Sequence, residues 1–307
     1  MHPTLFQIFS FRVPSYGAML ALSFLIGIFV ARHIAKKRGL DPDVIYDLGL
    51  FVIVAAVVGA RAYYVMTHLH EFSGNLLSIV NPFQDGQVGL SGLVMYGGFI
   101  ASIITAAVFF KVKKLPPLTY LDVCSPGVGF GIALTRVGCF LNGCCYGAAA
   151  KAGALFSIDY PNAGSPAGYY QYVTGSVHGL QPSQFYESAG GIAIGLILIF
   201  AGRSKRYFAG LQIYLLISLY AAVRFCIELT RAYTPGEMVG PLTHNQVICI
   251  VTFFVFGGLA VRGLIRGPVK VGGGQAKGSD SGQAKGGGND SIKNSAKNNA
   301  KKHGKKK

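Results

Sequence analysis

The sequence has few charged residues. Only 13% of its 307 residues are Asp, Glu, Lys or Arg, whereas 51% are hydrophobic, and the mean hydropathy is +0.44. Soluble globular domains are about 25% charged, so this balance argues against one and predicts a polytopic membrane protein. We expect one all-α membrane unit over residues 1–266.

Acidic residues are scarce, and the resulting excess of positive charge is concentrated at one end. The formal net charge is +16, and residues 268–307 contain ten lysines but only two aspartates. This segment has almost no large apolar side chains, so it cannot bury enough surface to offset its chain entropy. We expect residues 267–307 to form a disordered cytoplasmic tail that attracts anionic membrane lipids weakly and binds no nucleic acid.

The N-terminus lacks the basic segment of a signal peptide, and the cysteines lack the pattern of a secreted disulfide scaffold. Residues 1–15 read MHPTLFQIFSFRVPS, and most of the six cysteines lie inside apolar runs. We therefore expect no cleaved leader and no framework of structural disulfides.

Long apolar runs, by contrast, are abundant. A helix needs about 20 mostly apolar residues to cross a bilayer. The chain offers seven such candidates, at residues 16–31, 44–66, 92–110, 121–141, 183–201, 210–229 and 245–264. The fourth candidate contains Pro126 and Arg136, which are tolerated where a helix faces protein or a cavity rather than lipid.

The basic connections predict the orientation of these spans. Lys and Arg cluster after the first, third, fifth and seventh candidates, and the other connections carry few. The positive-inside rule then places the N-terminus in the periplasm and the C-terminus in the cytoplasm. The outer face would carry the long connections 67–91 and 143–182, and long ordered loops are usually functional.

Ionisable residues within the predicted spans are candidates for function because each costs roughly 3 kcal/mol to insert. The candidates are Arg61, Arg136, Glu187, Arg224 and Glu228. Tyr220, Arg224 and Glu228 follow at i, i+4 and i+8 and share one helix face. Arg136 and Arg224 together would bind a phosphate, such as a phospholipid headgroup. The alternative is a set of ion pairs that only hold helices together.

The chain contains seven short motifs whose order and spacing resemble those of the prolipoprotein diacylglyceryl transferases of bacterial inner membranes. The motifs are YGAML from Tyr16, GAR from Gly59, YGGFI from Tyr96, TRVGCFLNGCCYG from Thr135, QPSQFYE from Gln181, YAAVRFCIE from Tyr220 and LTHNQ from Leu242. The resemblance covers residues 16–264. It implies transfer of the diacylglyceryl group of phosphatidylglycerol to the cysteine thiol of a prolipoprotein signal peptide, with release of glycerol phosphate and without a metal or cofactor.

The same resemblance implies roles for individual residues. Arg136 and Arg224 match arginines that we assign to the phosphate, with Tyr96 and Glu228 as further catalytic candidates. The expected substrate-binding residues are Tyr16, Arg61, Asn142, Gly147, Gln184, Tyr186, Glu187 and Tyr220.

Four positions depart from the family pattern. Tyr96 and Gln181 stand where His is common, Cys139 where Asn is common, and Cys144 where Glu is common. A phenol has a pKa near 10, so Tyr96 is a poor base unless arginines lower that pKa, and Glu187 or Glu228 would substitute. The alternatives are a diverged paralogue with another lipid or acceptor, and a non-catalytic lipid-binding or redox-sensing membrane protein.

The cysteines near Arg136 have several candidate uses. Cys139, Cys144 and Cys145 would serve as small packing residues, or Cys139 would form a disulfide with one of the other two. A carrier thiol needs an activating base that the sequence does not identify. No histidine lies nearby at ligand spacing, so the sequence predicts no metal site.

Overall fold

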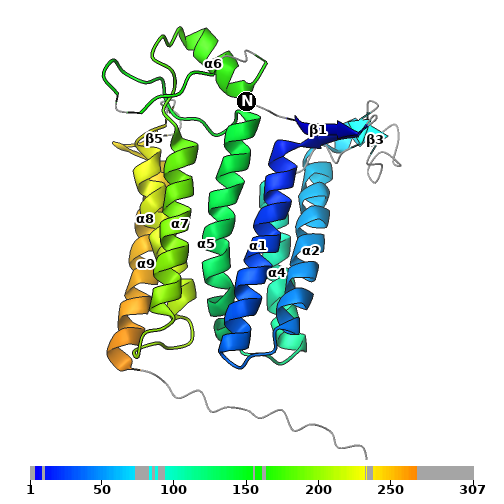
Figure 1. Ribbon diagram of the computed structural model, residues 1–307, viewed down its shortest axis with the longest axis vertical. Coiled ribbons are helices and arrows are strands. Elements are labelled where there is room, and N and C mark those ends of the chain that lie inside the picture. Colours follow the sequence, from blue (N-terminus) through cyan, green and yellow to red (C-terminus); the bar gives the residue numbers. More distant parts are fainter. Residues whose placement is uncertain are drawn as a thin grey trace, which may run out of the picture. The chain divides into compact units, whose positions relative to one another are not determined.

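The computed structural model describes residues 4–8, 11–72, 83–84, 87–88, 94–154, 156–160, 164–231, 233 and 238–267. Within them, seven helices are long and apolar enough to cross a membrane. They are α1 (Ser15–Lys37), α2 (Asp43–Thr67), α4 (Met95–Val112), α5 (Pro117–Asn142), α7 (Ser183–Ala201), α8 (Leu211–Glu228) and α9 (His244–Arg266). The predicted all-α polytopic fold is confirmed (Figure 1).

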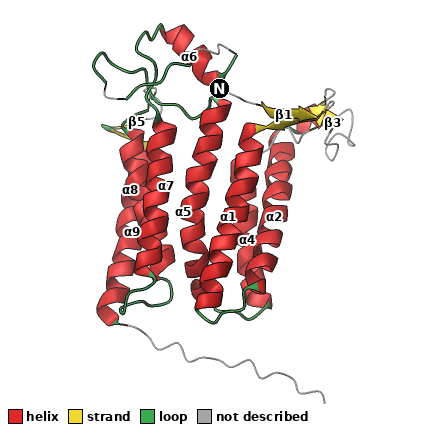
Figure 2. Cartoon of the chain, in the orientation of Figure 1, coloured by secondary structure: helices red, strands yellow, loops and turns green. Residues whose placement is uncertain are grey.

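The remaining elements are short. They are the helices α3 (Leu69–Phe72) and α6 (Pro166–Thr174) and the antiparallel pairs β1 (Thr4–Ile8) with β2 (Phe11–Pro14), β3 (Phe83–Gln84) with β4 (Gln87–Val88), and β5 (Met238–Val239) with β6 (Leu242–Thr243). Figure 2 shows α6 and these strands at the end of the bundle where α1, α4, α7 and α9 begin. We call this the α6 end. The tail predicted at residues 267–307 lies, except for Gly267, outside the described residues.

Helix α5 lies in the middle of the bundle. It packs against both α1 and α7, whereas α2 pairs with α4 and α8 pairs with α9. Its mean hydropathy is the lowest of the seven helices. Even so, 44% of the residues in its 18-residue apolar stretch are buried, against 11–39% in the other six helices. Because α5 contacts protein on several sides, it tolerates Pro126 and Arg136 within the membrane domain.

Glycines on α5 make this close packing possible. A Cβ on Gly127 would lie 2.6 Å from the carbonyl oxygen of Gly27 on α1, and one on Gly129 would lie 2.7 Å from the backbone nitrogen of Gly195 on α7. Both distances are to backbone atoms, which cannot shift easily to make room for a side chain. At these positions the glycine-rich GVGFG run therefore serves helix packing.

A buried carboxylate at the opposite end of the bundle joins α5 to the start of α8. Asp122 is fully buried and accepts hydrogen bonds from Tyr207 Oη (2.7 Å), the Gly210 backbone N–H (2.8 Å) and the Ile213 backbone N–H (2.9 Å). It thus caps the N-terminus of α8 from another helix. Burial and the Asp122 charge raise the pKa of Tyr207, so the phenol remains a donor.

We expect Asp122→Ala to destabilise the protein, because it removes the acceptor of two backbone N–H groups. Each unsatisfied buried donor costs about 1–3 kcal/mol. Thermal unfolding of the detergent-solubilised protein should show a lower midpoint. Asp43→Asn is the control, since the side chain of Asp43 forms an exposed ion pair with Arg32. An unchanged midpoint for Asp122→Ala would contradict this capping role.

The described residues of the connection between α5 and α7 lie at the α6 end of the bundle (Figure 1). Leu180 forms isolated bridges with Ala149 and Ile158. Leu180 also packs with Tyr160 and Ala167 in a small buried cluster. The connection therefore has its own apolar core, which fixes the backbone on either side of the central α5–α7 contact.

Candidate active site

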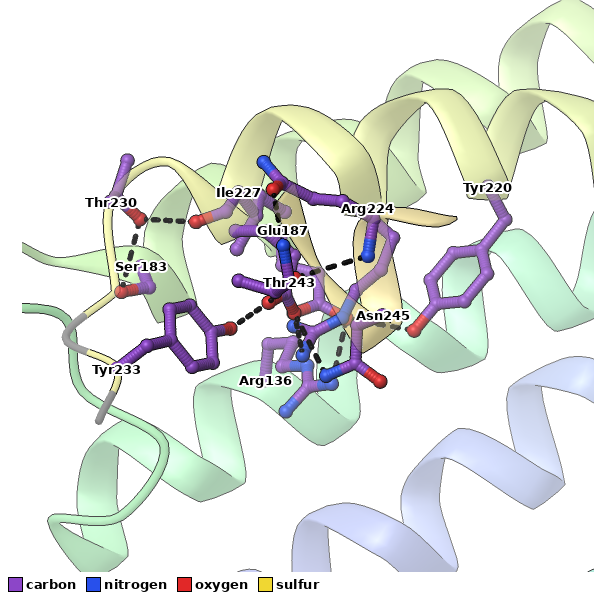
Figure 3. A network of polar contacts seen from close by, with 12 residues as sticks. Arg136, Ser183, Glu187, Tyr220, Arg224, Ile227, Thr230, Tyr233, Thr243 and Asn245 are labelled. Atoms are coloured by element: carbon purple, nitrogen blue, oxygen red, sulfur yellow. Dashed lines mark hydrogen bonds and ion pairs between the residues drawn. The ribbon is translucent and has the colours of Figure 1, made fainter. Parts of the chain in front are cut away.

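Four charged side chains from three helices form one ion-pair cluster (Figure 3). The cluster lies near the α6 end, because its residues stand close to the end of α5, the start of α7 and the end of α8. Arg136 Nη2 on α5 lies 2.6 Å from Glu187 Oε1 on α7. On α8, Arg224 Nη1 lies 3.5 Å from Glu187 Oε2, and Arg224 Nη2 lies 2.5 Å from Glu228 Oε1. The structure therefore brings together two of the three arginines and both carboxylates that the sequence singled out.

The two carboxylates are nearly inaccessible and heavily hydrogen-bonded. Glu187 accepts a hydrogen bond from Tyr220 Oη (3.0 Å), which confirms that Tyr220, Arg224 and Glu228 share one face of α8. Glu228 accepts hydrogen bonds from Tyr233, from Thr243 Oγ1 (3.4 Å) and from Asn245 Nδ2 (3.5 Å). A proton acceptor needs a free lone pair, and these carboxylates have most of theirs occupied.

The two guanidinium groups, by contrast, retain unused donors. The Arg136 and Arg224 side chains are 20% and 19% exposed, whereas the Glu187 and Glu228 side chains are 3% and 0% exposed. Among the described residues, Arg224 Nη1 has no hydrogen-bond partner, although it lies 3.5 Å from Glu187 Oε2, and Arg136 Nη1 contacts Cys139 Sγ at 3.8 Å. Since a guanidinium has five N–H donors, the pair can still bind an anion.

Three thiols adjoin Arg136. The Sγ atoms of Cys139, Cys144 and Cys145 all lie within 4.8 Å of one another. The cause is the way α5 ends: Gly143 adopts φ +74°, its N–H bonds to Phe140 O, and the Cys144 N–H bonds to Cys139 O. This is a Schellman turn, which brings the side chains at Cys139 and Cys144 together.

Cys145 completes the thiol cluster through an unusual backbone conformation. Its φ of +59° is in the left-handed region, which non-glycine residues seldom adopt. Hydrogen bonds from the Cys139 and Cys144 thiols lower the pKa of Cys145. Asn142, at the end of α5, interacts with Cys144, so this predicted residue lies at the thiol cluster rather than at Glu187.

Two predicted residues hold the cysteine segment in place. Gln184 is buried, donates from Nε2 to the Cys144 carbonyl (2.9 Å) and accepts from Tyr160 Oη (3.4 Å). Gly147 donates its backbone N–H to Gln181 O at 2.9 Å. Both residues therefore act on the site by positioning the segment that follows α5.

We expect Gly147→Ala to disturb this segment. A Cβ there would lie 2.6 Å from Thr230 O and 2.7 Å from Gln181 O, and backbone atoms must shift to relieve such contacts. Overpacking of this kind costs about 1–3 kcal/mol. Gly258→Ala on α9 is the matched control, because a Cβ there meets no atom within 4 Å. Equal unfolding midpoints for Gly147→Ala and Gly258→Ala would refute the steric argument.

The other predicted residues lie at varying distances from the cluster. Tyr16 is close enough to Arg136 and the three cysteines for electrostatic interaction. Tyr186 is half-buried on α7. Arg61 stacks on the rings of Tyr64 and Phe72, and Tyr96 is 67% exposed at the start of α4. The described contacts do not join Arg61 or Tyr96 to the ion-pair cluster.

Sequence reasoning missed Tyr233, Thr243 and Asn245, which bind Glu228. The LTHNQ motif contained a signal, because Thr243 and Gln246 have the spacing of a capping box. That box is present: Thr243 Oγ1 accepts from the Gln246 N–H, and Gln246 Oε1 accepts from the Thr243 N–H. The cap fixes the start of α9 beside the end of α8, where Thr243 and Asn245 reach Glu228.

Comparison with known proteins identifies the family. The sequence profile described as "Prolipoprotein diacylglyceryl transferase" matches residues 3–262. The chain belongs to this family. The match includes every residue of the ion-pair cluster and of the thiol cluster.

Similar members of the prolipoprotein diacylglyceryl transferase family come from several bacteria. Proteins named phosphatidylglycerol–prolipoprotein diacylglyceryl transferase include one from Finegoldia magna, 31% identical over 245 residues, which cover 80% of this chain and 89% of that protein. The protein of that name from Clostridium tetani is 29% identical over 83% of this chain and 95% of its own. The one from Lactobacillus johnsonii is 31% identical over 83% and 87%. Family membership and the seven apolar helices indicate a multi-pass membrane protein.

Proposed function

We propose that this protein transfers the diacylglyceryl group of phosphatidylglycerol to the cysteine thiol of a prolipoprotein signal peptide lipobox and releases glycerol phosphate. The observation that carries the proposal is the convergence of Arg136 and Arg224 on Glu187 from different helices, with unused donors on both guanidinium groups. Phosphatidylglycerol carries one negative charge on a phosphodiester, which such donors bind bidentately.

The reaction is a nucleophilic substitution at carbon. The acceptor sulfur forms a bond to the glyceryl carbon that bears the phosphate oxygen, and the carbon–oxygen bond breaks. The electron pair of that bond moves to the phosphate oxygen, so negative charge grows on the leaving glycerol phosphate. Arg136 and Arg224 would stabilise this charge where it develops, which is how preorganised donors accelerate a reaction.

We place the α6 end at the periplasmic leaflet of the bacterial inner membrane. Basic residues support this orientation, because Lys36, Lys37, Lys111 and Arg266 lie in the last turns of α1, α4 and α9, at the opposite end of the bundle. By the positive-inside rule that end faces the cytoplasm. The ion-pair cluster would then meet lipid from the outer leaflet.

A transfer assay tests this function directly. The purified protein is incubated with a lipobox peptide and vesicles of either phosphatidylglycerol or phosphatidylethanolamine, and the mass of the peptide is measured. We expect addition of one diacylglyceryl group with phosphatidylglycerol only, and none to a peptide whose cysteine is replaced by serine. An unmodified peptide in phosphatidylglycerol, under conditions in which a family member of known activity modifies it, would reject the proposal.

A further inference from the structure

The proposed reaction needs a deprotonated acceptor thiol, and the expected bases are poorly placed to produce one. Tyr96 is largely exposed, outside the described contacts of the ion-pair cluster. Glu187 and Glu228 are both engaged in ion pairs and hydrogen bonds. A group near Arg136 that lowers the proton affinity of the acceptor thiol would meet this need, since thiolate rather than thiol is the nucleophile.

The thiol cluster has the dimensions of a metal site. Zinc binds thiolates at about 2.3 Å, so sulfurs on adjacent corners of a tetrahedron lie about 3.8 Å apart. The three Sγ atoms of Cys139, Cys144 and Cys145 already lie within 4.8 Å of one another. Small side-chain rotations would bring them to coordination distance. The expectation of no metal rested on missing histidines, but three thiolates suffice because they are strong ligands for soft cations.

We propose that Cys139, Cys144 and Cys145 bind one thiophilic divalent cation of the Zn²⁺ class, whose fourth coordination position takes the acceptor thiol. Catalytic zinc sites commonly have three protein ligands and one exchangeable position. This inference rests on the proposed transferase function, which supplies the acceptor, and it assigns the three cysteines to the activation of that acceptor.

The chemistry balances without an oxidant and without a base from the protein. When the acceptor thiol coordinates the cation, its proton passes to water and its sulfur remains as a metal-bound thiolate. The sulfur then attacks the glyceryl carbon, and the carbon–oxygen bond breaks with its electron pair moving to the phosphate. The product is a neutral thioether, a weaker ligand than a thiolate, so it leaves the cation readily.

The surrounding charges favour this site. Three thiolates with one divalent cation carry a net charge of −1. Arg136 and Arg231 both interact electrostatically with Cys145, and Arg136 Nη1 lies 3.8 Å from Cys139 Sγ. Arg136 thus adjoins both the proposed phosphate site and the proposed cation, which places the nucleophile next to the leaving group, as substitution requires.

A disulfide explains the arrangement less well. A disulfide joins two sulfurs and would leave the third thiol unused, whereas the structure gathers all three. The structure places Cys145 in a left-handed backbone conformation that non-glycine residues seldom adopt. In a three-ligand site, all three thiols coordinate the cation.

Metal binding to the full-length, reduced protein in detergent tests the site itself. We expect one Zn²⁺ per chain by elemental analysis, and a thiolate-to-metal absorption band when Cd²⁺ is added. Replacing Cys139, Cys144 or Cys145 by serine should weaken Cd²⁺ binding at least about 100-fold, because even outer-sphere changes cost about 10–100-fold. The matched control replaces Cys124, Cys226 and Cys249 by alanine and should bind normally.

Two results would overturn the metal site. One is unchanged Cd²⁺ binding after Cys139, Cys144 and Cys145 are all replaced by serine. The other is protein isolated without reductant that contains a disulfide within this trio and no metal.

The transfer assay distinguishes failure of this inference from failure of the proposed function. Protein stripped with a chelator should lose transfer, and Zn²⁺ should restore it to the intact protein but not to Cys145→Ser. Full transfer by the stripped protein would overturn the metal role and leave the transferase function standing. A metal-loaded protein that modifies no acceptor would overturn the transferase function and, with it, the assignment of the fourth coordination position.

Discussion

Replacement of Arg136 by alanine should reduce transfer of the diacylglyceryl group by about 10²–10³-fold, the usual cost of removing one donor to a developing oxyanion. The variant should still fold, because Glu187 keeps its ion pair with Arg224 and its hydrogen bond from Tyr220. The measurement is kcat/KM for lipobox peptide in phosphatidylglycerol vesicles, together with thermal unfolding to confirm that the protein is intact.

Companion variants show whether the loss comes from phosphate binding. Arg136→Lys should recover only part of the activity, since lysine keeps the charge but not the bidentate geometry. Adding Arg224→Ala to Arg136→Ala should cost less than the sum of the two single effects, because both groups bind one anion. The matched control is Arg32→Ala, whose exposed ion pair with Asp43 is remote from the site. Wild-type activity in the Arg136→Ala Arg224→Ala protein would rule out the role of these arginines.

Replacement of Glu187 by alanine should have the largest effect on stability. Glu187 is the only carboxylate among the described ion pairs that both Arg136 and Arg224 contact, and its side chain is 3% exposed. Removing one partner of a buried ion pair costs about 3–5 kcal/mol, because the remaining charge is left buried without compensation. We expect poor accumulation of Glu187→Ala in membranes and a markedly lower unfolding midpoint in detergent.

The conservative variant separates charge from shape. Glu187→Gln keeps an acceptor for Tyr220 Oη and should unfold at an intermediate temperature. Asp47→Asn is the matched control, because the Asp47 and Lys113 side chains of that pair are 51% and 52% exposed, and such pairs contribute about 0–1 kcal/mol. Equal stabilities of Glu187→Ala and Asp47→Asn would show that the central ion pairs do not hold α5, α7 and α8 together.

The seven spans were predictable from the sequence because a lipid environment imposes a simple requirement on each segment separately. Every spanning segment must be apolar and about 20 residues long. The hydropathy along the chain indicates both properties without reference to the other helices. The periodicity of a single helix was equally sufficient to place Tyr220, Arg224 and Glu228 on one face of α8.

The pairing of side chains from different helices required the tertiary structure. Asp122 is an acidic residue within a predicted apolar span, and the fold brings it to the N-terminus of α8. Tyr233, Thr243 and Asn245 reach Glu228 because the capped start of α9 lies beside the end of α8. Contacts of this kind depend on helix packing, which hydropathy does not describe.

Seven apolar helices, with arginines and glutamates inside them, follow from the amino-acid sequence alone, because insertion into lipid constrains each segment locally. Which charges share a site depends on the packing of the helices, which joins Arg136 and Arg224 through Glu187. The tertiary structure also gathered three thiols within 4.8 Å through the Gly143 turn and the left-handed Cys145. The physical reason is that residue spacing along a chain fixes the face of a helix, whereas the partners of that face depend on how the helices pack.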